Sequence, residues 1–269
     1  MIRIGVRSFV SAGGGTDADA QAFITAAGIT DATQQSAINT LVTDLKGYSI
    51  WDKMKAIYPF VGGTSSTHKW NLKDPRDLDA AFRLVFSGGW THSSTGALPN
   101  GTNGYADTFL KPNTSLTLNS THMSYYSRTS TSNSGIDDFG ANNSTNQLQR
   151  IIIKDGATTN NYVDMNSTSQ RIASTVTDPS GFFIANRENS TSLKSIKNNT
   201  LLGSNSNTNT GTLPSVSMYL SALNNNGSSV NYSARQCAFA SIGDGLTATE
   251  LSNLYTAVQA YQTTLSRNV

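Results

Sequence analysis

Carboxylates are the side chains most able to do hydrolytic chemistry, and this chain has few of them in useful positions. A glycosidase needs two carboxylates that flank the scissile bond at a defined separation. The only glutamates are Glu188 and Glu250, and Glu188 in NREN has no acidic neighbour within reach on one strand face. Asp137 and Asp138 in SGIDDFG are adjacent, so in a strand their side chains would point to opposite faces.

A further acidic cluster, DPRDLDA, contains Asp74, Asp77 and Asp79. It follows a proline-bounded loop, in which aspartates commonly act as turn acceptors rather than as catalysts. The segment SGGWTHSSTG lacks the strand–turn–helix context of a hydrolase nucleophile elbow. The sequence therefore predicts no catalytic residue and no enzyme.

Metal and cofactor motifs are weak or missing. His68, His92 and His122 are widely separated and show none of the spacings of zinc ligands. GGGTDADA is rich in glycine, but Asp17 and Asp19 at the start of the helix disfavour a phosphate there. We expect no cofactor. Calcium stays open as an alternative, because it accepts loosely arranged loop oxygens, and the candidates are Asp137, Asp138 and Asp155.

Aromatic residues beside polar loops offer a second kind of site. Sugars stack on aromatic faces, and the candidates for such a platform are Trp70, Trp90, His92 and Tyr105. The competing interpretation is that the tryptophans belong to the core. Both interpretations remain open at the level of sequence.

Composition limits the classes of partner. Only 13% of the residues are charged, against about 25% in an average protein. The net charge of +2 is not gathered into a basic patch, so nucleic acid is an unexpected partner. No window approaches about 20 apolar residues, so we expect no membrane insertion. The N-terminal apolar run is too short for a secretory signal, which predicts synthesis in a cytoplasm.

Three regions of different character position these residues. Residues 1–15 read as an anchoring arm, in which a β-prone stretch is followed by three glycines at 13–15. Residues 16–66 have helical periodicity, with Thr16 or Asp17 as the first N-cap and Asp31 as the second. Gln34 completes a capping box with Asp31, and Gly28 and Gly47 are stops. SIWDKMKAIY predicts a third short helix over 49–58. We interpret 16–66 as a helical attachment segment.

Residues 67–269 read as one β-sandwich closed by a helix. Short apolar runs alternate with turn clusters, as in LDAAFRLVFS, SLTLN, GFFIANR and RQCAFASIG, and Asn198 and Asn199 mark a hairpin tip. The stretch 155–173 is polar enough for exposed strands or a long loop. At the end, Thr247 and Glu250 form a capping box, and Leu254 lies on the apolar face of the helix that follows.

The stretch NGTNGYADTFL predicts a tight corner that leads into a strand near Tyr105. Within it, GTNGYADTFL resembles the early strand of laminin-G and concanavalin A-like domains. RQCAFASIGDGLTATELSNLYTAVQAYQTTL is similar to the ending of those domains. With SIWDKMKAIYPFVGG and NLKDPRDLDAAFRLVF in front, the layout resembles a group of bacteriophage virion proteins over nearly the whole chain after residue 15.

The resemblance implies a mainly β protein, with a concanavalin A-like jelly roll preceded by helices and closed by a C-terminal helix. It implies a structural component of the virion, such as a head-decoration, fibre or tail protein. Its partners would be other virion proteins, further copies of the chain, and glycans of a host surface. The metal and sugar ligands of legume lectins have no counterparts here, so none is transferred. The alternative is a soluble lectin or glycan-processing enzyme of the same class.

Overall fold

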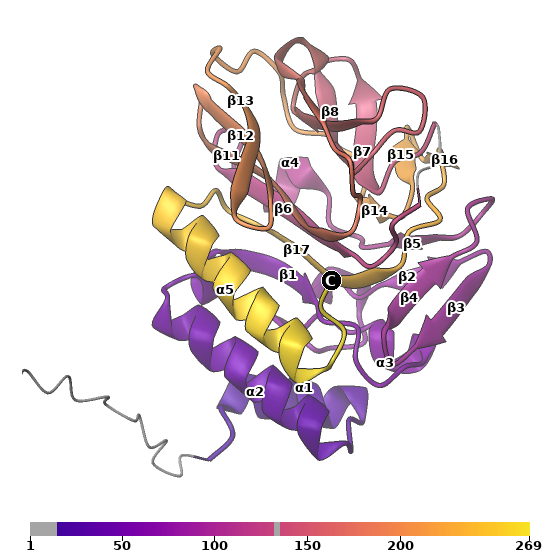
Figure 1. The fold of residues 1–269 in the computed structure, drawn as a ribbon, viewed down its shortest axis with the longest axis vertical. Helices are drawn as coiled ribbons and strands as arrows, with labels where there is room; N and C mark the ends of the chain where they lie inside the picture. Colours follow the sequence, from indigo (N-terminus) through magenta and orange to yellow (C-terminus); the bar gives the residue numbers. More distant parts are fainter. Residues whose placement is uncertain (1–14, 132–134) are drawn as a thin grey trace, which may run out of the picture.

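The computed structural model describes residues 15–131 and 135–269, which form three layers: helices, a first sheet and a second sheet (Figure 1). Figure 1 shows α1, α2 and α5 together on the outer side of β1 and β17, while β7 and β8 lie at the opposite end of the molecule. The helices are α1 (Ala18–Ala27), α2 (Ala32–Gly47), α3 (Ser65–His68), α4 (Pro112–Ser115) and α5 (Ala248–Thr264).

Sheet A is the middle layer, in the order β13-β12-β11-β6-β17-β4-β3, with β1 pairing β17 as well. All its pairings are antiparallel. Its strands are β1 (Met54–Tyr58), β3 (Trp90–Ser93), β4 (Gly96–Pro99), β6 (Thr121–Ser127), β11 (Gly181–Asn189), β12 (Ser192–Lys197), β13 (Thr200–Asn205) and β17 (Cys237–Gly243).

Sheet B is the outer layer, in the order β10-β9-β8-β7-β14-β5-β2. β15 pairs with β16 and, in parallel, with β7. Its strands are β2 (Val85–Ser87), β5 (Tyr105–Asp107), β7 (Phe139–Ser144), β8 (Gln147–Ile152), β9 (Asn160–Met165), β10 (Ile172–Thr175), β14 (Tyr219–Leu220), β15 (Leu223–Asn225) and β16 (Ser228–Val230). The stretch 155–173 thus supplies β9 and the start of β10 rather than a long loop.

Sheet A separates two hydrophobic cores. The sandwich core lies between the sheets, and its larger members include Tyr58, Tyr125, Phe139, Ile151 and Phe183. The helix-side core lies between sheet A and the helices, and its larger members include Phe23, Leu41, Phe182, Phe239 and Tyr261. Neighbouring residues of one strand therefore enter different cores. This explains the uninterrupted apolar runs FFIA in GFFIANR and CAFA in CAFASIG.

The predicted mainly β sandwich with a C-terminal helix is confirmed, and so are the first two helices. Asp17 and Asp31 accept backbone N–H bonds at the starts of α1 and α2. Gln34 does not complete a capping box, because its side-chain oxygen accepts the amide of Gly62 instead, at 2.8 Å. The arm predicted for 1–15 lies outside the described residues except for Gly15. Whether 16–66 acts as an attachment segment stays a prediction.

The predicted third helix is wrong. Only Trp51–Lys53 form a 3-10 turn, and Met54–Tyr58 form strand β1, which pairs with β17 in sheet A. Ala56 and Tyr58 enter the sandwich core, while Met54 and Ile57 enter the helix-side core. A strand buried on both faces gives a continuous apolar run, which local periodicity cannot distinguish from a buried helix.

The corner at NGTNGYADTFL carries the chain from β4 in sheet A to β5 in sheet B. The Asn100 side-chain oxygen accepts three backbone amides, from Thr102, Asn103 and Gly104, at 3.0–3.1 Å. A Cβ on Gly104 would lie 2.5 Å from the Gly89 carbonyl oxygen, so only glycine fits there. The predicted strand start at Tyr105 is confirmed.

The other strand predictions have mixed outcomes. The hairpin tip is confirmed, since Asn198 and Asn199 have positive φ between β12 and β13. SLTLN forms only an isolated bridge between Thr117 and Ser120. LDAAFRLVFS is a strand only at its end, because Phe82 has a φ of 58° after a 3-10 turn. No helix in the described ranges is long and apolar enough to cross a membrane.

The closing helix α5 has the predicted capping box between Thr247 and Glu250. We expect Leu254→Ala to lower the free energy of unfolding by about 2–5 kcal/mol, because Leu254 is fully buried in the helix-side core. Thr247→Ala should cost about 1 kcal/mol through the lost cap. Urea denaturation measures both, with exposed Thr263→Ala as the control. Three equal, negligible shifts would mean that α5 is not docked.

Candidate functional site

Two of the four predicted sugar-stacking residues lie in one aromatic cluster. Trp90 and His92 on β3 are stacked with ring centroids 6.0 Å apart, and both pack edge-on against Phe86 of β2, at 5.1 and 4.6 Å. The indole N–H of Trp90 donates to the backbone oxygens of Ser87 and Tyr105. Trp90 is half-buried and packs against the sandwich core, whereas its role in sugar stacking stays a prediction.

The other two candidates point elsewhere. The ring of Tyr105 stacks on the ring of Tyr219, with centroids 4.6 Å apart. Only the backbone oxygen of Tyr105 contacts Trp90, as the acceptor of the indole N–H described above. Trp70 packs against the helix-side core, and its indole N–H donates to Ser66. The four residues therefore do not form one continuous platform.

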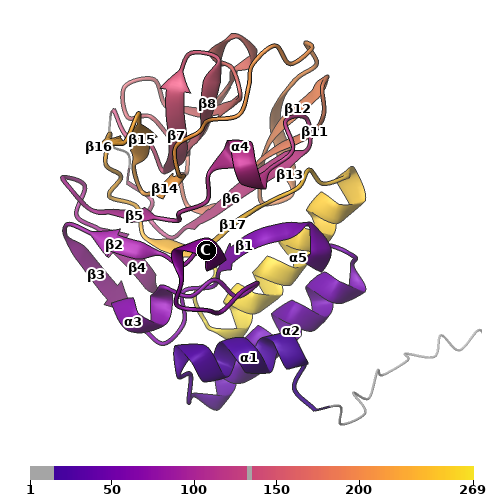
Figure 2. The same cartoon turned by 180° about the vertical axis from the view of Figure 1, so that it is seen from behind.

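A hollow of about 280 Å³ lies beside the aromatic cluster, where α3 meets β2. Figure 2 shows α3 next to the β3–β4 hairpin and close to β2. We call it the α3–β2 hollow, and its lining residues are Ser65, Ser66, Lys69, Arg83, Leu84, Val85 and Phe86. Its size is close to the lower end, about 300 Å³, of small-molecule sites. Phe86 belongs both to the hollow and to the aromatic cluster.

Three ion pairs, which join the lining residues Lys69 and Arg83 to Asp77 and Asp79, give the hollow a balanced polar rim. Asp77 accepts Lys69 Nζ at 2.5 Å and Arg83 Nη1 at 2.8 Å, and Asp79 accepts Arg83 Nη2 at 2.8 Å. The bond from Lys69, followed by that from Arg83, lowers the pKa of Asp77. Two positive and two negative groups leave the rim without net charge. These aspartates, taken from the sequence as turn acceptors, thus serve mainly as partners of Arg83 and Lys69.

Below the hollow, two histidines contact each other directly. His68 Nδ1 lies 2.9 Å from His92 Nδ1, although 24 positions separate them in the sequence. The His68 ring is buried, and no partner of its Nε2 is found in the described structure. Burial, then His92 and Arg267, lowers the pKa of His68 to about 3. No local sequence signal reveals this pair, because only the β3 fold-back brings His92 to α3.

His122, the third histidine, lies apart from this pair. It is fully buried on β6, with Nδ1 2.6 Å from the Asp244 backbone oxygen and Nε2 3.3 Å from Ser241 Oγ. Burial lowers its pKa to about 4. The wide spacing of the histidines in the sequence therefore corresponds to a separation in space for His122, but not for His68 and His92, which are in contact.

These shifts predict loss of stability in mild acid. Between about pH 6.5 and 4 the unfolded chain protonates His68 and His122 while the native chain does not, so each lowers the free energy of unfolding by about 1.4 kcal/mol per pH unit. Burial raises the pKa of Asp137 to about 6. Over most of that pH range, protonation of Asp137 in the native chain therefore offsets the effect of one histidine on the free energy of unfolding. We expect a net slope of about 1.4 kcal/mol per unit in urea denaturation. A flat profile would contradict these protonation states.

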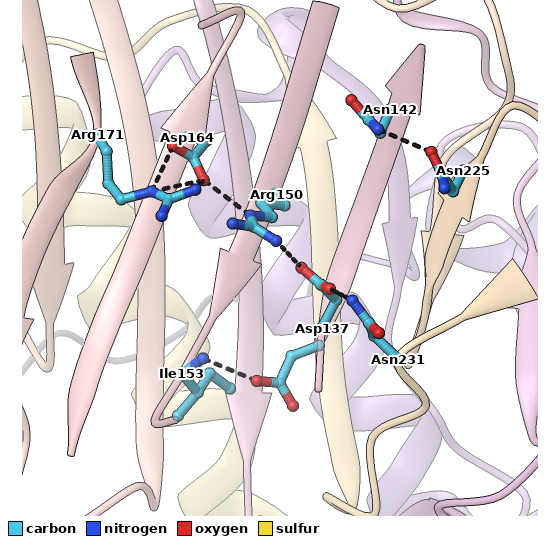
Figure 3. Close-up of polar contacts among 9 residues, drawn as sticks. Asp137, Asn142, Arg150, Ile153, Asp164, Arg171, Asn225 and Asn231 are labelled. Carbon is cyan, nitrogen blue, oxygen red and sulfur yellow. Dashed lines mark hydrogen bonds and ion pairs between the residues drawn. The ribbon is translucent and has the colours of Figure 1, made fainter. Parts of the chain in front are cut away.

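The calcium candidates are occupied by protein groups. Asp137 accepts a hydrogen bond from Arg150 at 3.2 Å and one from Asn231 at 2.8 Å. Arg150 also pairs with Asp164, and Asp164 pairs in turn with Arg171 (Figure 3). Asp138 faces the other way and accepts the Ile153 amide and Ser233 Oγ. Asp155 accepts Ala157 N and Thr158 Oγ1 within its own turn. Within 15–131 and 135–269, no cluster of three or more His, Cys, Asp or Glu side chains is placed to hold a metal.

The two glutamates are engaged as well. Glu250 accepts the Thr247 amide at 2.8 Å and pairs with Lys53 at 2.6 Å. Glu188 lies 3.6 Å from Lys194. Neither has a carboxylate partner among these contacts.

No protein-family model matches the chain, and no curated protein sequence matches it either. Solved structures do. The binding domain of Paraclostridial Mosquitocidal Protein 1 is 13% identical, with a TM-score of 0.52, over 77% of this chain and 53% of that one. Domain 4 of AbnA, a GH43 extracellular arabinanase from Geobacillus stearothermophilus in complex with arabinotriose, is 14% identical, with a TM-score of 0.46, over 75% and 98%.

Botulinum neurotoxin type C, whose cell entry depends on interaction with two ganglioside molecules, is 14% identical, with a TM-score of 0.47, over 78% of this chain and 52% of that one. The chain thus spans about half the length of the two toxin structures. At these identities the likeness concerns the fold alone. The chain is a mainly β sandwich of two sheets with a C-terminal helix, a fold that it shares with that binding domain.

Proposed function

We propose that the chain is a non-enzymatic interaction protein that binds neutral glycan units at the α3–β2 hollow. The observation that carries the proposal is the pairing of an apolar floor, Leu84 to Phe86, with a rim of zero net charge. A guanidinium has five N–H donors, and three from Arg83 are used by Asp77 and Asp79. The remaining donors and the second carboxylate oxygen of Asp79 suit neighbouring sugar hydroxyls.

The balanced rim favours uncharged sugars over acidic ones, because it offers no uncompensated positive charge. The absence of catalysis is supported by Glu188 and Glu250, each of which is engaged with a lysine. The fold, shared with the binding domain of Paraclostridial Mosquitocidal Protein 1, supports an interaction role.

A glycan array with the full chain tests the proposal. We expect retention of uncharged glycans that falls about tenfold or more in Arg83→Gln, since a hydrogen bond to a charged group contributes about 1.5–3 kcal/mol. Arg76→Gln is the matched control, because Arg76 is an exposed arginine that pairs with Asp74 outside the hollow. Equal retention by all three proteins, or none, would refute the site. Release of shortened glycan would favour the alternative, a glycan-processing enzyme.

We further propose that several copies act together as a virion component, as the sequence resemblance implies. One shallow sugar site binds weakly, whereas linked copies raise effective affinity by about 10²–10⁴ without new contacts. Sedimentation velocity tests this part. We expect an oligomer for the full chain and a folded, smaller species after deletion of residues 1–14. A monomeric full chain would contradict the proposal.

A further inference from the structure

The histidine pair connects the two walls of the α3–β2 hollow. His68 is the last residue of α3, which supplies Ser65 and Ser66 to one wall. His92 packs edge-on against Phe86, which belongs to the other wall, at 4.6 Å. The Nδ1–Nδ1 contact of 2.9 Å therefore holds the walls at a fixed spacing.

That contact requires one nitrogen to donate and the other to accept. We assign the donor to His68 Nδ1–H, because the opposite tautomer would bury an N–H at His68 Nε2, an atom with no partner within 15–131 and 135–269. An unpaired buried N–H is rarer and more costly than an unpaired acceptor. His92 Nδ1 is then the acceptor, on a ring that is only half-buried.

We propose that the pair is an acid-sensitive contact, in which one proton added to His92 Nδ1 separates α3 from β3 and opens the hollow. Protonation places two N–H groups against each other across 2.9 Å. The alternative is for His68 to move its proton to Nε2, which has no hydrogen-bond partner among the described residues. Either outcome weakens the contact. Regulation of ligand binding by this route rests on the proposed function, whereas the opening itself does not.

The surroundings offer no compensation for a second proton. Phe60, Phe86 and Trp90 pack on the two rings and carry no charge. Arg267, from the C-terminal tail, also disfavours positive charge at His68. Among the described residues, no carboxylate is hydrogen-bonded to either ring. Since burial lowers the pKa of His92 from 6.5, the opening is expected below that pH.

Histidine NMR and amide hydrogen exchange on the ligand-free protein test the contact. We expect the His68 Nδ1–H signal to lose its hydrogen bond in step with protonation of His92. The reporting amides are His68, which donates to Thr64, and Leu84, which donates to Lys69. As the pH is lowered from 7 until NMR shows His92 protonated, the protection of these amides, corrected for intrinsic exchange, should fall about tenfold, the factor that 1.4 kcal/mol gives.

His92→Gln is the informative variant, because its side-chain oxygen can accept from His68 and does not titrate. Its amide protection should stay constant over the same range. Thr91→Gln, an exposed change on the same strand, should behave as wild type. A His68 bond that persists after His92 is protonated, or equal loss in wild type and His92→Gln, would overturn the proposal.

Glycan binding distinguishes this proposal from the proposed function. A glycan retained at neutral pH should dissociate from wild type, and not from His92→Gln, at about pH 5. If no glycan binds but the exchange response appears, the glycan site is wrong and the acid-sensitive contact stands. Binding that weakens equally in both proteins would remove the regulatory role.

Discussion

Replacing Arg267 by methionine is expected to lower the free energy of unfolding by about 3–6 kcal/mol. Arg267 is buried and donates to the backbone oxygens of Pro59, Phe60 and Ala238 and to Gln262 Oε1. The backbone oxygen of Phe60 and the side-chain oxygen Oε1 of Gln262 have no other donor in the described hydrogen bonds. Each buried group that is left unpaired costs about 1–3 kcal/mol. Methionine keeps most of the packed aliphatic stem, so the loss is expected to come mainly from these unpaired oxygens.

Urea denaturation measures the effect, and Arg76→Met is the matched control. The Arg76 side chain is 63% exposed and forms one surface ion pair, so its replacement should change stability by about 0.5 kcal/mol or less. The loss of stability in Arg267→Lys should lie between the losses in the two methionine variants, because lysine keeps the charge but cannot reach four acceptors from one planar group. Equal midpoints for Arg267→Met and Arg76→Met would show that the tail is not locked to β1 and β17.

Asp164→Ala is expected to cost about 3–5 kcal/mol, the range for breaking a buried ion pair on one side. The Asp164 carboxylate is fully buried and accepts Arg150 Nε at 2.7 Å and Arg171 Nε at 2.9 Å. Figure 3 shows it between the two guanidinium groups, on the strand next to that of Arg150. Without it, Arg150 keeps only the buried Asp137 as an ionic partner.

Arg171 is one-third exposed and turns to solvent at little cost, so most of the loss is expected to come from Arg150. Asp178→Ala is the control, since Asp178 is 55% exposed and lies 3.7 Å from Lys197. Its change should stay within about 1 kcal/mol. A combined Asp164→Ala, Arg150→Ala variant more stable than Asp164→Ala would confirm that the penalty is an uncompensated charge. A single-variant loss similar to that of Asp178→Ala would contradict the estimate.

The sequence by itself determined the elements whose signals are local. The caps at Asp17, Asp31 and Thr247, the hairpin tip at Asn198 and the corner at Asn100 depend on residues within four positions of one another. Such hydrogen bonds form wherever those few residues occur together, so the pattern of types is sufficient. Alternating turn clusters and apolar runs then give the sandwich class.

Tertiary structure decided whatever depends on partners far along the chain. Met54–Tyr58 is a strand because β17, about 185 positions later, supplies its hydrogen bonds. His68 meets His92, and Asp137 meets Arg150 and Asn231, only after the sheets have set their registers. The α3–β2 hollow likewise exists only where a helix end, a loop and a strand converge. Local sequence fixes a residue's backbone preference, whereas a side chain's neighbours, and hence its charge state and chemistry, follow from long-range packing.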